Sequence, residues 1–321
     1  MRTIPQQIAA NRRASLIYAL LLVVLLAALG TAIFGAYYPR QWYLGTVGAT
    51  LLGVIAAIIA RVSGPSIILS ISGAREATHH EDQVLDNVVE EMAIAAGLPK
   101  PKVYVIDDNA PNAFATGSTP QTGAIAVTTG LMNKLDRDEL QGVVAHEMGH
   151  IRNEDIRFMT TITLVAGLIP LLADFFIRMQ WFGGGRSRSR DRDDNNLGAI
   201  FMVVGLVLAI LAPIFSKLLE MAVSRQREFL ADATAAELTR YPEGLARALA
   251  KISSDPDPLA SANRATQHLY IVNPLRLSGE GSNLFSTHPS TEERIKRLMG
   301  TAGVIGTSSR RPPLIPPRIQ T

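Results

Sequence analysis

Four long apolar segments constrain the fold of this chain more than any other feature. Residues 14–40 carry no charge between their ends, and this segment is longer than the roughly 20 residues that a helix needs to cross a bilayer. Three further apolar segments cover residues 41–60, 158–177 and 197–216. Charged residues make up only 18% of the chain, against about 25% in soluble domains. The pattern predicts an integral membrane protein with four transmembrane helices in two hairpins.

Basic residues precede the first segment, as they also do in a secretory signal peptide. That segment is longer than the usual signal core of about 7–15 residues, and a second apolar segment follows at once, so a membrane anchor is favoured. Arg2, Arg12 and Arg13 outnumber Arg40 beyond the span, which predicts a cytoplasmic N-terminus. An even number of spans then returns both polar regions of the chain to the cytoplasm.

The stretch between the third and fourth apolar segments does not fit this orientation. Residues 183–192 are rich in Gly, Arg and Ser, which is typical of a flexible, solvated loop, and in this topology they lie outside the cell. Basic loops normally stay on the cytoplasmic side. Either the first helix sets the topology, which we favour, or the third and fourth segments do not span fully.

The composition limits the kinds of site and partner. The chain has no cysteine, so a metal would have to be bound by His, Asp or Glu. The net charge is +3, and the basic residues are spread along the chain with few aromatic residues between them, so nucleic acid is not expected as a partner. A slightly basic chain with long apolar segments indicates a lipid bilayer instead.

The polar regions combine helices with short strands. Residues 84–96 are expected to form a helix that Gly97 ends, since glycine is the common residue just beyond a helix C-terminus. Residues 102–106, 112–116 and 124–128 are β-branched or alternate between apolar and polar types, which predicts three strands. A small sheet beside helices is the expected result.

The sequence His146-Glu147-Met148-Gly149-His150 carries the most specific chemistry. Asp136 and Glu139 form a capping box that starts a helix ahead of it. His146 and His150 lie four residues apart and share one helix face, so both imidazoles can bind one Zn²⁺. Glu147 can then take a proton from a zinc-bound water without binding the metal itself. The alternative is a solvated helix face with two ordinary histidines.

A catalytic zinc site needs a third protein ligand and an open fourth position. Glu228 and Asp232 lie four residues apart on a helix that continues from the fourth apolar segment. Glu228 can bind the metal while Asp232 accepts the outer N–H of a ligating imidazole, although both could be ordinary surface carboxylates. His150 lies 8 residues before the third apolar segment and Glu228 lies 12 residues after the fourth, so a helical hairpin would return both to one side of the bilayer.

These motifs occur together with two others and with the four apolar segments. Residues 112–117 read Asn-Ala-Phe-Ala-Thr-Gly, and residues 285–289 read Phe-Ser-Thr-His-Pro. In this combination the chain resembles the HtpX-type membrane zinc endopeptidases, relatives of the CAAX prenyl proteases, over about residues 10–300. CAAX proteases have more spans and a longer chain, so the HtpX branch is preferred.

The resemblance implies a gluzincin fold, in which a small sheet packs on the active-site helix and a second helix carries a ligand Glu. It implies that His146, His150 and Glu228 bind one Zn²⁺ and that Glu147 is the general base. It further implies a bacterial inner-membrane protease with a cytoplasmic active site, which degrades damaged or misassembled membrane proteins and overlaps in function with FtsH.

We therefore expect an α+β membrane protein in five parts. A transmembrane hairpin (1–62) precedes the first part of a catalytic domain with the HExxH helix (63–157). A second hairpin with the Arg-rich loop (158–218) precedes the second part of that domain, which holds the third zinc ligand (219–300). A proline-rich tail (301–321) is expected to be disordered.

Two further features are candidates for the reaction itself. His288 precedes a proline and a predicted helix, so it could donate to the oxyanion of the tetrahedral intermediate, or it could simply cap that helix. Peptides usually enter such sites as an added strand at a sheet edge. Asn112, Ala113, Phe114 and Ala115 are the expected substrate-binding strand, with a purely structural strand as the alternative.

Other residues are expected to support the site. Arg294 or Arg225 could hold the ligand helix by pairing with carboxylates, a role that we favour over a catalytic one. Residues 253–283 form a long irregular stretch that could act as a lid or a substrate-binding loop, because long loops in compact domains are often functional. The adjacent pair His79 and His80 would point apart in a regular helix or strand and is not favoured as a metal site.

Two other classes of function remain as alternatives. One is a membrane scaffold that keeps zinc for structure, but a structural zinc closes its fourth position with a protein ligand, and none stands at a suitable spacing. The other is a small-molecule transporter. The four spans offer a single buried acidic residue, Asp174, and intramembrane charge usually marks a transport route.

Overall fold

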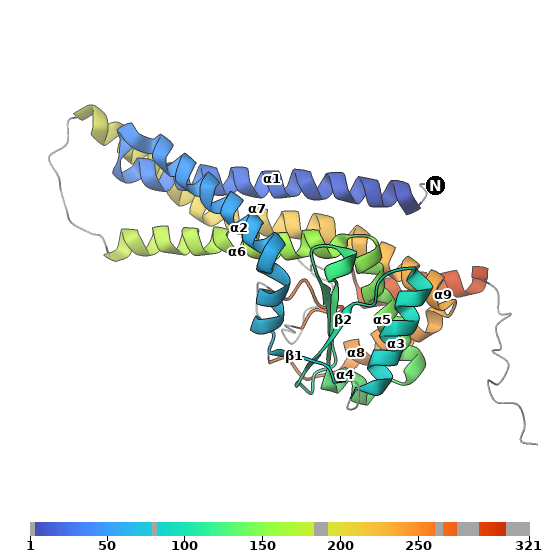
Figure 1. Cartoon of the computed structure of the whole chain (residues 1–321). Coiled ribbons are helices and arrows are strands. Elements are labelled where there is room, and N and C mark those ends of the chain that lie inside the picture. The colour runs from blue at the N-terminus through green and yellow to red at the C-terminus, as the bar shows by residue number, and fades with distance from the viewer. Residues whose placement is uncertain (1–3, 79–81, 183–191, 261–265, 275–288, 306–321) are drawn as a thin grey trace, which may run out of the picture.

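The computed structural model describes residues 4–78, 82–182, 192–260, 266–274 and 289–305 (Figure 1). The helices are α1 (Ile4–Tyr37), α2 (Trp42–Ile71), α3 (Gln83–Ala96), α4 (Thr129–Lys134), α5 (Arg137–Arg152), α6 (Asp155–Phe182), α7 (Arg192–Thr239), α8 (Pro242–Ser254) and α9 (Thr291–Ile305). The strands are β1 (Ala74–Glu76), β2 (Lys102–Ile106), β3 (Ala113–Thr116) and β4 (Ala124–Thr128), and η1 (Pro39–Gln41) and η2 (Pro120–Thr122) are 3₁₀ turns.

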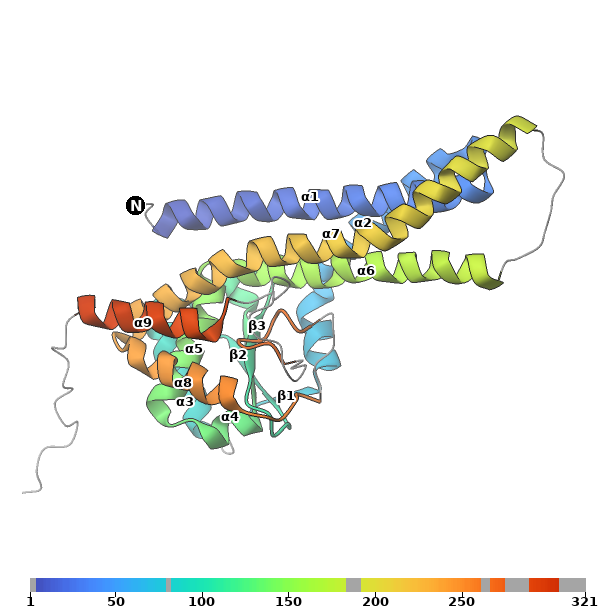
Figure 2. The same ribbon diagram turned by 180° about the vertical axis from the view of Figure 1, so that it is seen from behind.

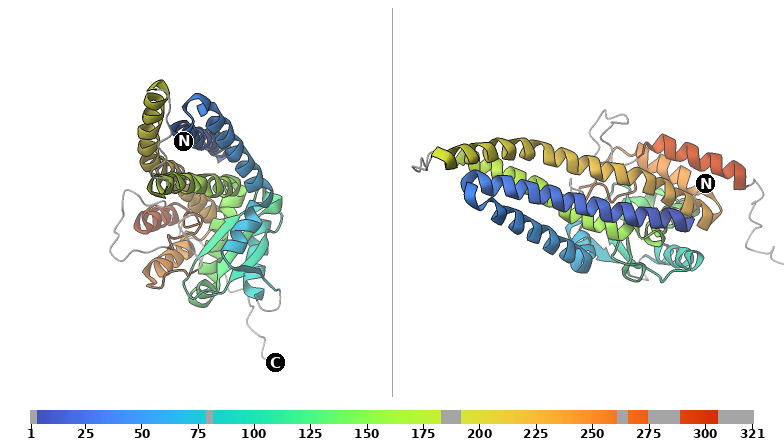
Figure 3. Two further views of the ribbon diagram at one scale, coloured as in Figure 1. Left: turned by 90° about the vertical axis from the view of Figure 1, so that its left-hand side faces the viewer. Right: turned by 90° about the horizontal axis from the view of Figure 1, so that it is seen from above.

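Four helices are long and apolar enough to cross a membrane, as predicted. The candidate spans are Leu16–Tyr37, Pro39–Ile71, Asp155–Met179 and Asn196–Ser216. Figures 1 and 2 show α1, α2, α6 and α7 side by side, and Figure 3 gives the same bundle from the end and from above. The start of α1 and the sheet lie at one end of the bundle, and the start of α7 lies at the other. This is the arrangement expected for an even number of spans.

The long helices continue beyond their apolar segments. The second apolar segment ends at Ala60, but α2 runs on to Ile71, where Ile68 and Leu69 are buried against the sheet. Helix α7 is continuous over 48 residues and joins the fourth apolar segment to the predicted ligand helix. All four predicted part boundaries fall inside helices, so the division into parts stays a prediction. Continuous helices therefore connect the bundle to the sheet domain.

Two sequence expectations need correction. Residues 301–305 belong to α9, where Thr301 donates to the carbonyl of Arg297, so the expected disordered tail does not begin at residue 301. The helix continues because Leu298 still packs into the core of the domain. Asp174 is exposed rather than buried and forms an ion pair with Arg178 one turn later. Since that pair faces outward, it marks no polar route between the helices.

The sheet has the strand order β1-β2-β4-β3. Strands β2 and β4 are parallel, whereas β1 and β3 pair antiparallel with β2 and β4 at the two edges. All three predicted strands form, although the one expected from residue 112 begins at Ala113. Helix α3 ends at Gly97, which adopts the left-handed φ of +66° that favours glycine. The edge strand β3 is the one that lies against α5.

Two apolar cores hold this domain together. The larger one packs the inner sides of α3, α5 and α8 against the sheet, with Val105, Val127, Val144 and Leu249 fully buried. The smaller one lies on the other face of the sheet, where Phe114 of β3 meets the end of α2. Burying each such side chain contributes roughly 1.5–3 kcal/mol, so both faces of β3 are firmly packed.

Candidate metal centre

Helix α5 carries the HExxH motif through the centre of the domain. Its predicted capping box forms, with Asp136 accepting from the backbone N–H of Glu139 and Glu139 accepting from that of Asp136. Every residue of the motif is buried, and His146 is fully inaccessible. The imidazoles of His146 and His150 lie with ring centroids 4.8 Å apart, nearly perpendicular to each other. Both therefore present ring nitrogens to the same small volume.

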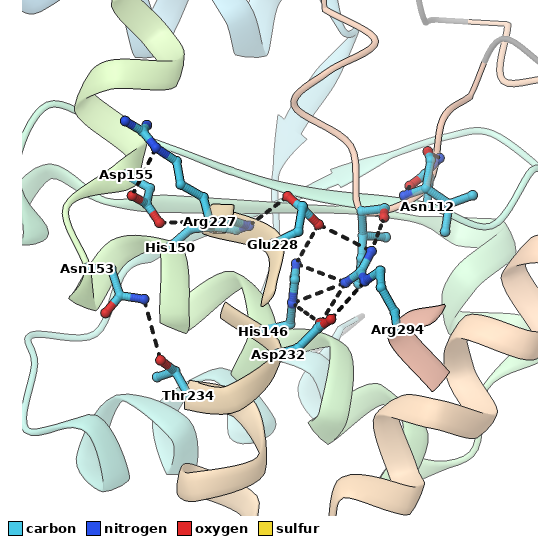
Figure 4. Close-up of polar contacts among 12 residues, drawn as sticks. Asn112, His146, His150, Asn153, Asp155, Arg227, Glu228, Asp232, Thr234 and Arg294 are labelled. Carbon is cyan, nitrogen blue, oxygen red and sulfur yellow. Dashed lines mark hydrogen bonds and ion pairs between the residues drawn. The ribbon is translucent and has the colours of Figure 1, made fainter. Parts of the chain in front are cut away.

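Helix α7 brings Glu228 to these two imidazoles (Figure 4). The Oε2 atom of Glu228 lies 3.6 Å from Nε2 of His146, and its Oε1 atom lies 3.5 Å from Nε2 of His150. One ligand atom from each of the three residues falls within 4.8 Å of the others. Gly149 eases this approach, because a Cβ atom there would stand only 3.2 Å from the Cα atom of Ala231 on α7.

Asp232 and Arg294 support His146. The Nδ1 atom of His146 lies 2.9 Å from Oδ1 of Asp232, and Arg294 donates to both carboxylate oxygens of Asp232, at 2.9 and 2.7 Å. Nη1 of Arg294 also lies 3.2 Å from Oε2 of Glu228. Burial alone would raise the pKa of Asp232, but the Arg294 charge and these hydrogen bonds lower it. Arg294, which is only 1% exposed, thus holds the ligand helix as expected.

Asp155 and Arg227 support His150 in the same way. The Nδ1 atom of His150 lies 3.3 Å from Oδ2 of Asp155, and Nε of Arg227 lies 3.6 Å from Oδ1 of that carboxylate. The Arg227 guanidinium also stacks 3.8 Å from the ring centroid of Phe158. Burial disfavours the charged imidazole, yet the hydrogen bonds that Asp155 and Glu228 accept from it raise the pKa of His150 to about 10.

Sequence reasoning did not find Asp155 or Arg227. Asp155 follows the end of α5, where Glu154 adopts a left-handed φ of 58° and turns the chain into α6. This turn carries Asp155 back beside His150, five residues earlier. A positive φ at a residue other than glycine is uncommon, and nothing in the local sequence announces it. The arginine that pairs with Asp155 is Arg227, two residues beyond the Arg225 considered from sequence.

Glu147 stands apart from these pairs. It is 1% exposed, and within the residues that the structure describes neither carboxylate oxygen has a hydrogen-bond partner. Burial raises the pKa of Glu147 to about 7, and the Glu228 charge adds to this, while His150, Arg294 and the approaching backbone N–H of Ala115 oppose it. A buried carboxylate without a partner beside two imidazoles and a third carboxylate fits a metal site in which Glu147 is not a ligand.

The donor set fits zinc. Two imidazoles and one carboxylate are ligands that zinc takes in catalytic sites, and each imidazole has a carboxylate on its outer nitrogen. In the described part of the chain, His146, His150 and Glu228 are the one group of three such residues placed to share an ion. Among the described residues no fourth protein ligand joins this group, and a set of three protein ligands is what a catalytic zinc site has.

The expected substrate strand is an edge strand, but part of its edge is covered by the chain itself. The backbone N–H of Ile271 donates to the carbonyl of Ala113, and the Asn112 side chain bonds both polar groups of the Val272 backbone. Polar groups of alternate residues face the same edge of a strand, so Ala115 faces outward beside Ala113. The Ala115 half of β3 is therefore the part next to Glu147 at which a peptide could add.

Some candidate residues lie outside the described part of the chain. These are His288, the histidines at 79 and 80, the Arg-rich stretch up to residue 191 and much of the proposed lid. Pro289 lies two residues before the start of α9, and Arg294 on that helix reaches the site. Of the proposed lid, the structure describes residues 253–260 and 266–274, and residues 271 and 272 are the part that bonds to β3 and Asn112.

The sequence comparisons point to one family. The family model of peptidase family M48 matches residues 79–302. A protein named Protease HtpX homolog from Caldanaerobacter subterraneus is 47% identical over 92% of this chain and 97% of its own length. A protein of the same name from Dictyoglomus thermophilum is 48% identical over 92% of this chain and 94% of its own length. The crystal structure of S. mikatae Ste24p covers 90% of this chain and 67% of that protein, at 21% identity and a TM-score of 0.48.

Proposed function

Since this chain belongs to peptidase family M48 and is a membrane metalloprotease, we propose that it is a zinc endopeptidase with His146, His150 and Glu228 as ligands. The observation that carries the proposal is Glu147, a buried carboxylate that has no hydrogen-bond partner among the described residues and stands beside the three ligands. A scaffold with a structural zinc would have no use for such a group, and the group that could share an ion contains no fourth protein ligand.

Zinc bound there would polarise the scissile carbonyl and lower the pKa of a water at the open position. The protein's own part in the reaction is proton transfer. Glu147 takes the proton of the attacking water and later returns it to the leaving amine. Burial suits this role, because it raises the pKa of Glu147 to about 7, close to the pH at which the group must both accept and release a proton. His288 is the proposed donor to the oxyanion.

The substrates we propose are polypeptides in extended form. Such a peptide would add to the outer edge of β3 at Ala115, where the strand runs beside Glu147. Because continuous helices place the site next to the bundle, membrane proteins are the substrates within nearest reach. The position of Asn112 and Ala113 under residues 271–272 limits how far the peptide can extend on that side.

We place the protein in the inner membrane of a bacterium, with the site facing the cytoplasm. The support is the excess of arginine before the first span, together with the position of that end of α1 at the same end of the bundle as the sheet. The proposed role is quality control of damaged or misassembled membrane proteins, in functional overlap with FtsH. The bilayer is the partner that the exposed apolar faces of the four spans require.

The test is purification in detergent with a chelator, followed by addition of zinc and incubation with casein. Glu147→Gln is the matched variant, since it keeps the shape of the side chain and removes its charge. We expect cleavage by the parent protein and none by the variant, with the same zinc content in both. Equal cleavage by both proteins would overturn the role of Glu147, and absence of zinc from both would overturn the ligand set.

A further inference from the structure

Helix α2 contains a proline beyond its apolar segment. Pro65 lies in the interior of the helix and has no N–H, so the carbonyl of Arg61, four residues earlier, loses its usual hydrogen bond. The hydroxyl of Ser118 donates to this carbonyl. Ser118 belongs to a different part of the fold, 57 positions later in the chain. A side chain of the sheet domain therefore takes the place of the hydrogen bond that Pro65 removes.

Ser118 lies two residues after the end of the edge strand β3, and the two residues before it are fixed to a second membrane helix. Thr116, the last residue of β3, lies with its hydroxyl 3.2 Å from that of Thr160 on α6. The same Thr160 hydroxyl lies 3.3 Å from the carbonyl of Gly117. Gly117 has a φ of +151°, and a Cβ atom there would stand 2.7 Å from the side chain of Ile156 on α6. The end of β3 is thus held between α6 on one side and α2 on the other.

The two ends of β3 are held by different means. At its start, Asn112 and Ala113 bond to the backbone of residues 271 and 272. At its end, the bonds run to the two membrane helices through Thr116, Gly117 and Ser118. Ala115 lies between these two sets of bonds, and its backbone N–H approaches Glu147. The bonds at the end of the strand therefore determine where the edge at Ala115 lies relative to the catalytic helix.

We propose that Ser118 is a positioning residue for peptide binding, because it fixes the Ala115 end of β3 to α2 at the carbonyl that Pro65 leaves open. This rests on the proposed function, in which the substrate adds to that edge. Ser118 does not touch the substrate; it acts through the strand. A misplacement of about 1 Å in a substrate-binding group can cost up to 100-fold in rate, so one fixed strand end is enough to matter.

The first test is kinetic and uses the full chain with zinc in detergent. Ser118→Ala should raise KM for an unstructured peptide by about threefold to tenfold with little change in kcat, which is what the loss of one hydrogen bond allows. Ser118→Thr keeps a hydroxyl and should keep a KM near that of the parent. Thr301→Val is the matched control, since the Thr301 hydroxyl also donates to a helix carbonyl, that of Arg297, on α9.

The second test uses Pro65. In Pro65→Ala the new N–H at position 65 can donate to the Arg61 carbonyl, so that Ser118 is no longer required there. Ser118→Ala should then change KM far less in the Pro65→Ala background than in the parent. An equal change in both backgrounds, or no change in the parent, would overturn the proposal.

The third test does not depend on cleavage. Amide hydrogen exchange of residues 113–119 should be faster in Ser118→Ala than in the parent, and slow again in Ser118→Thr. If the parent cleaves nothing with zinc bound, the proposed function fails, while the exchange measurement still decides whether Ser118 fixes the strand. Unchanged exchange in Ser118→Ala would overturn the proposal even in an active enzyme.

Discussion

The two imidazoles of the metal site have the same kind of support, but the two supports come from different regions. His146 pairs with Asp232, which pairs with Arg294 from the last described helix. His150 pairs with Asp155 at the start of a membrane helix, and Asp155 pairs with Arg227. We call Asp232 and Arg294 the His146 arm, and Asp155 and Arg227 the His150 arm. The His146 arm connects the site to the C-terminal part of the domain, and the His150 arm connects it to the bundle.

The two arms also differ in tightness. The His146 arm has contacts of 2.9 and 2.7 Å, and Arg294 reaches in addition Glu228 and the carbonyl of Ile271. The contacts of the His150 arm are 3.3 and 3.6 Å long, and its arginine, Arg227, stacks on the ring of Phe158. The ligand geometry therefore depends mainly on the first arm. The second arm is the looser one, through which the membrane helix α6 can influence the site.

The largest effect should come from removing the arginine of the tighter arm. Arg294→Met leaves two buried carboxylates, Asp232 and Glu228, without their common cation. Loss of one partner from a buried ion pair costs about 3–5 kcal/mol. We expect a markedly lower Tm, with the larger loss in the zinc-free protein, because zinc compensates the charge of Glu228. Thermal unfolding in detergent, with zinc and with chelator, measures both values.

The control for this variant lies on the same helix. Arg297→Met removes an exposed arginine that pairs with Glu293 and stacks on Phe229. Exposed pairs contribute only about 0–1 kcal/mol, so its Tm should stay close to that of the parent. If Arg294→Met were no worse than Arg297→Met, the arm that we call tighter would not be a support of the site.

The next effect concerns the carboxylate of that arm. Asp232→Asn keeps the shape but removes the charge that His146 and Arg294 share. Removing such a partner of a metal-bound imidazole weakens metal affinity by about 10- to 100-fold, and we expect the upper end here. Competition with a chelating dye at fixed free zinc measures it. Glu237→Gln, on the same helix but in an exposed pair with Arg152, should leave zinc affinity unchanged.

A smaller effect is expected from the carboxylate of the looser arm. Asp155→Asn should weaken zinc binding by about 10-fold, the lower end of that range, because its contact with His150 is longer. Asp174→Asn, on the same helix, is the control and should bind zinc as the parent does. If Asp155→Asn weakens zinc binding as strongly as Asp232→Asn does, then the contact distances do not determine how much each arm supports the site, and the comparison fails.

The tighter arm could be predicted from sequence and the looser one could not. His146, His150, Glu228 and Asp232 all follow from helix periodicity, since each pair lies four residues apart on one helix. Asp155 becomes a neighbour of His150 only because the chain turns at a residue with positive φ. Both arms consist of residue types that the sequence shows, but the four-residue spacing of a helix predicts only the pairing of His146 with Asp232.

The same limit applies to the sheet. Three of the four strands, the capping box and the helix end at Gly97 depend on residues that are close in sequence, and they form as predicted, whereas β1 was not expected. The cover on β3 depends on Val272, 160 positions from Asn112, and the bond at Arg61 depends on Ser118. Contacts of this kind follow from how helices and strands pack, which no local pattern contains.

The smallest effect should come from a change that keeps the charge of the looser arm. Arg227→Lys retains a cation near Asp155 but loses the planar group that stacks 3.8 Å from the Phe158 ring centroid. We expect a loss of about 0.5–1 kcal/mol in stability, which is part of the roughly 2 kcal/mol of a buried cation–π contact because a lysine ammonium can also lie over the ring, and an unchanged zinc affinity. Arg294→Lys should cost more, because a single ammonium cannot reach Asp232, Glu228 and the Ile271 carbonyl together. Equal losses in the two lysine variants would show that charge, rather than the number of fixed contacts, separates the arms.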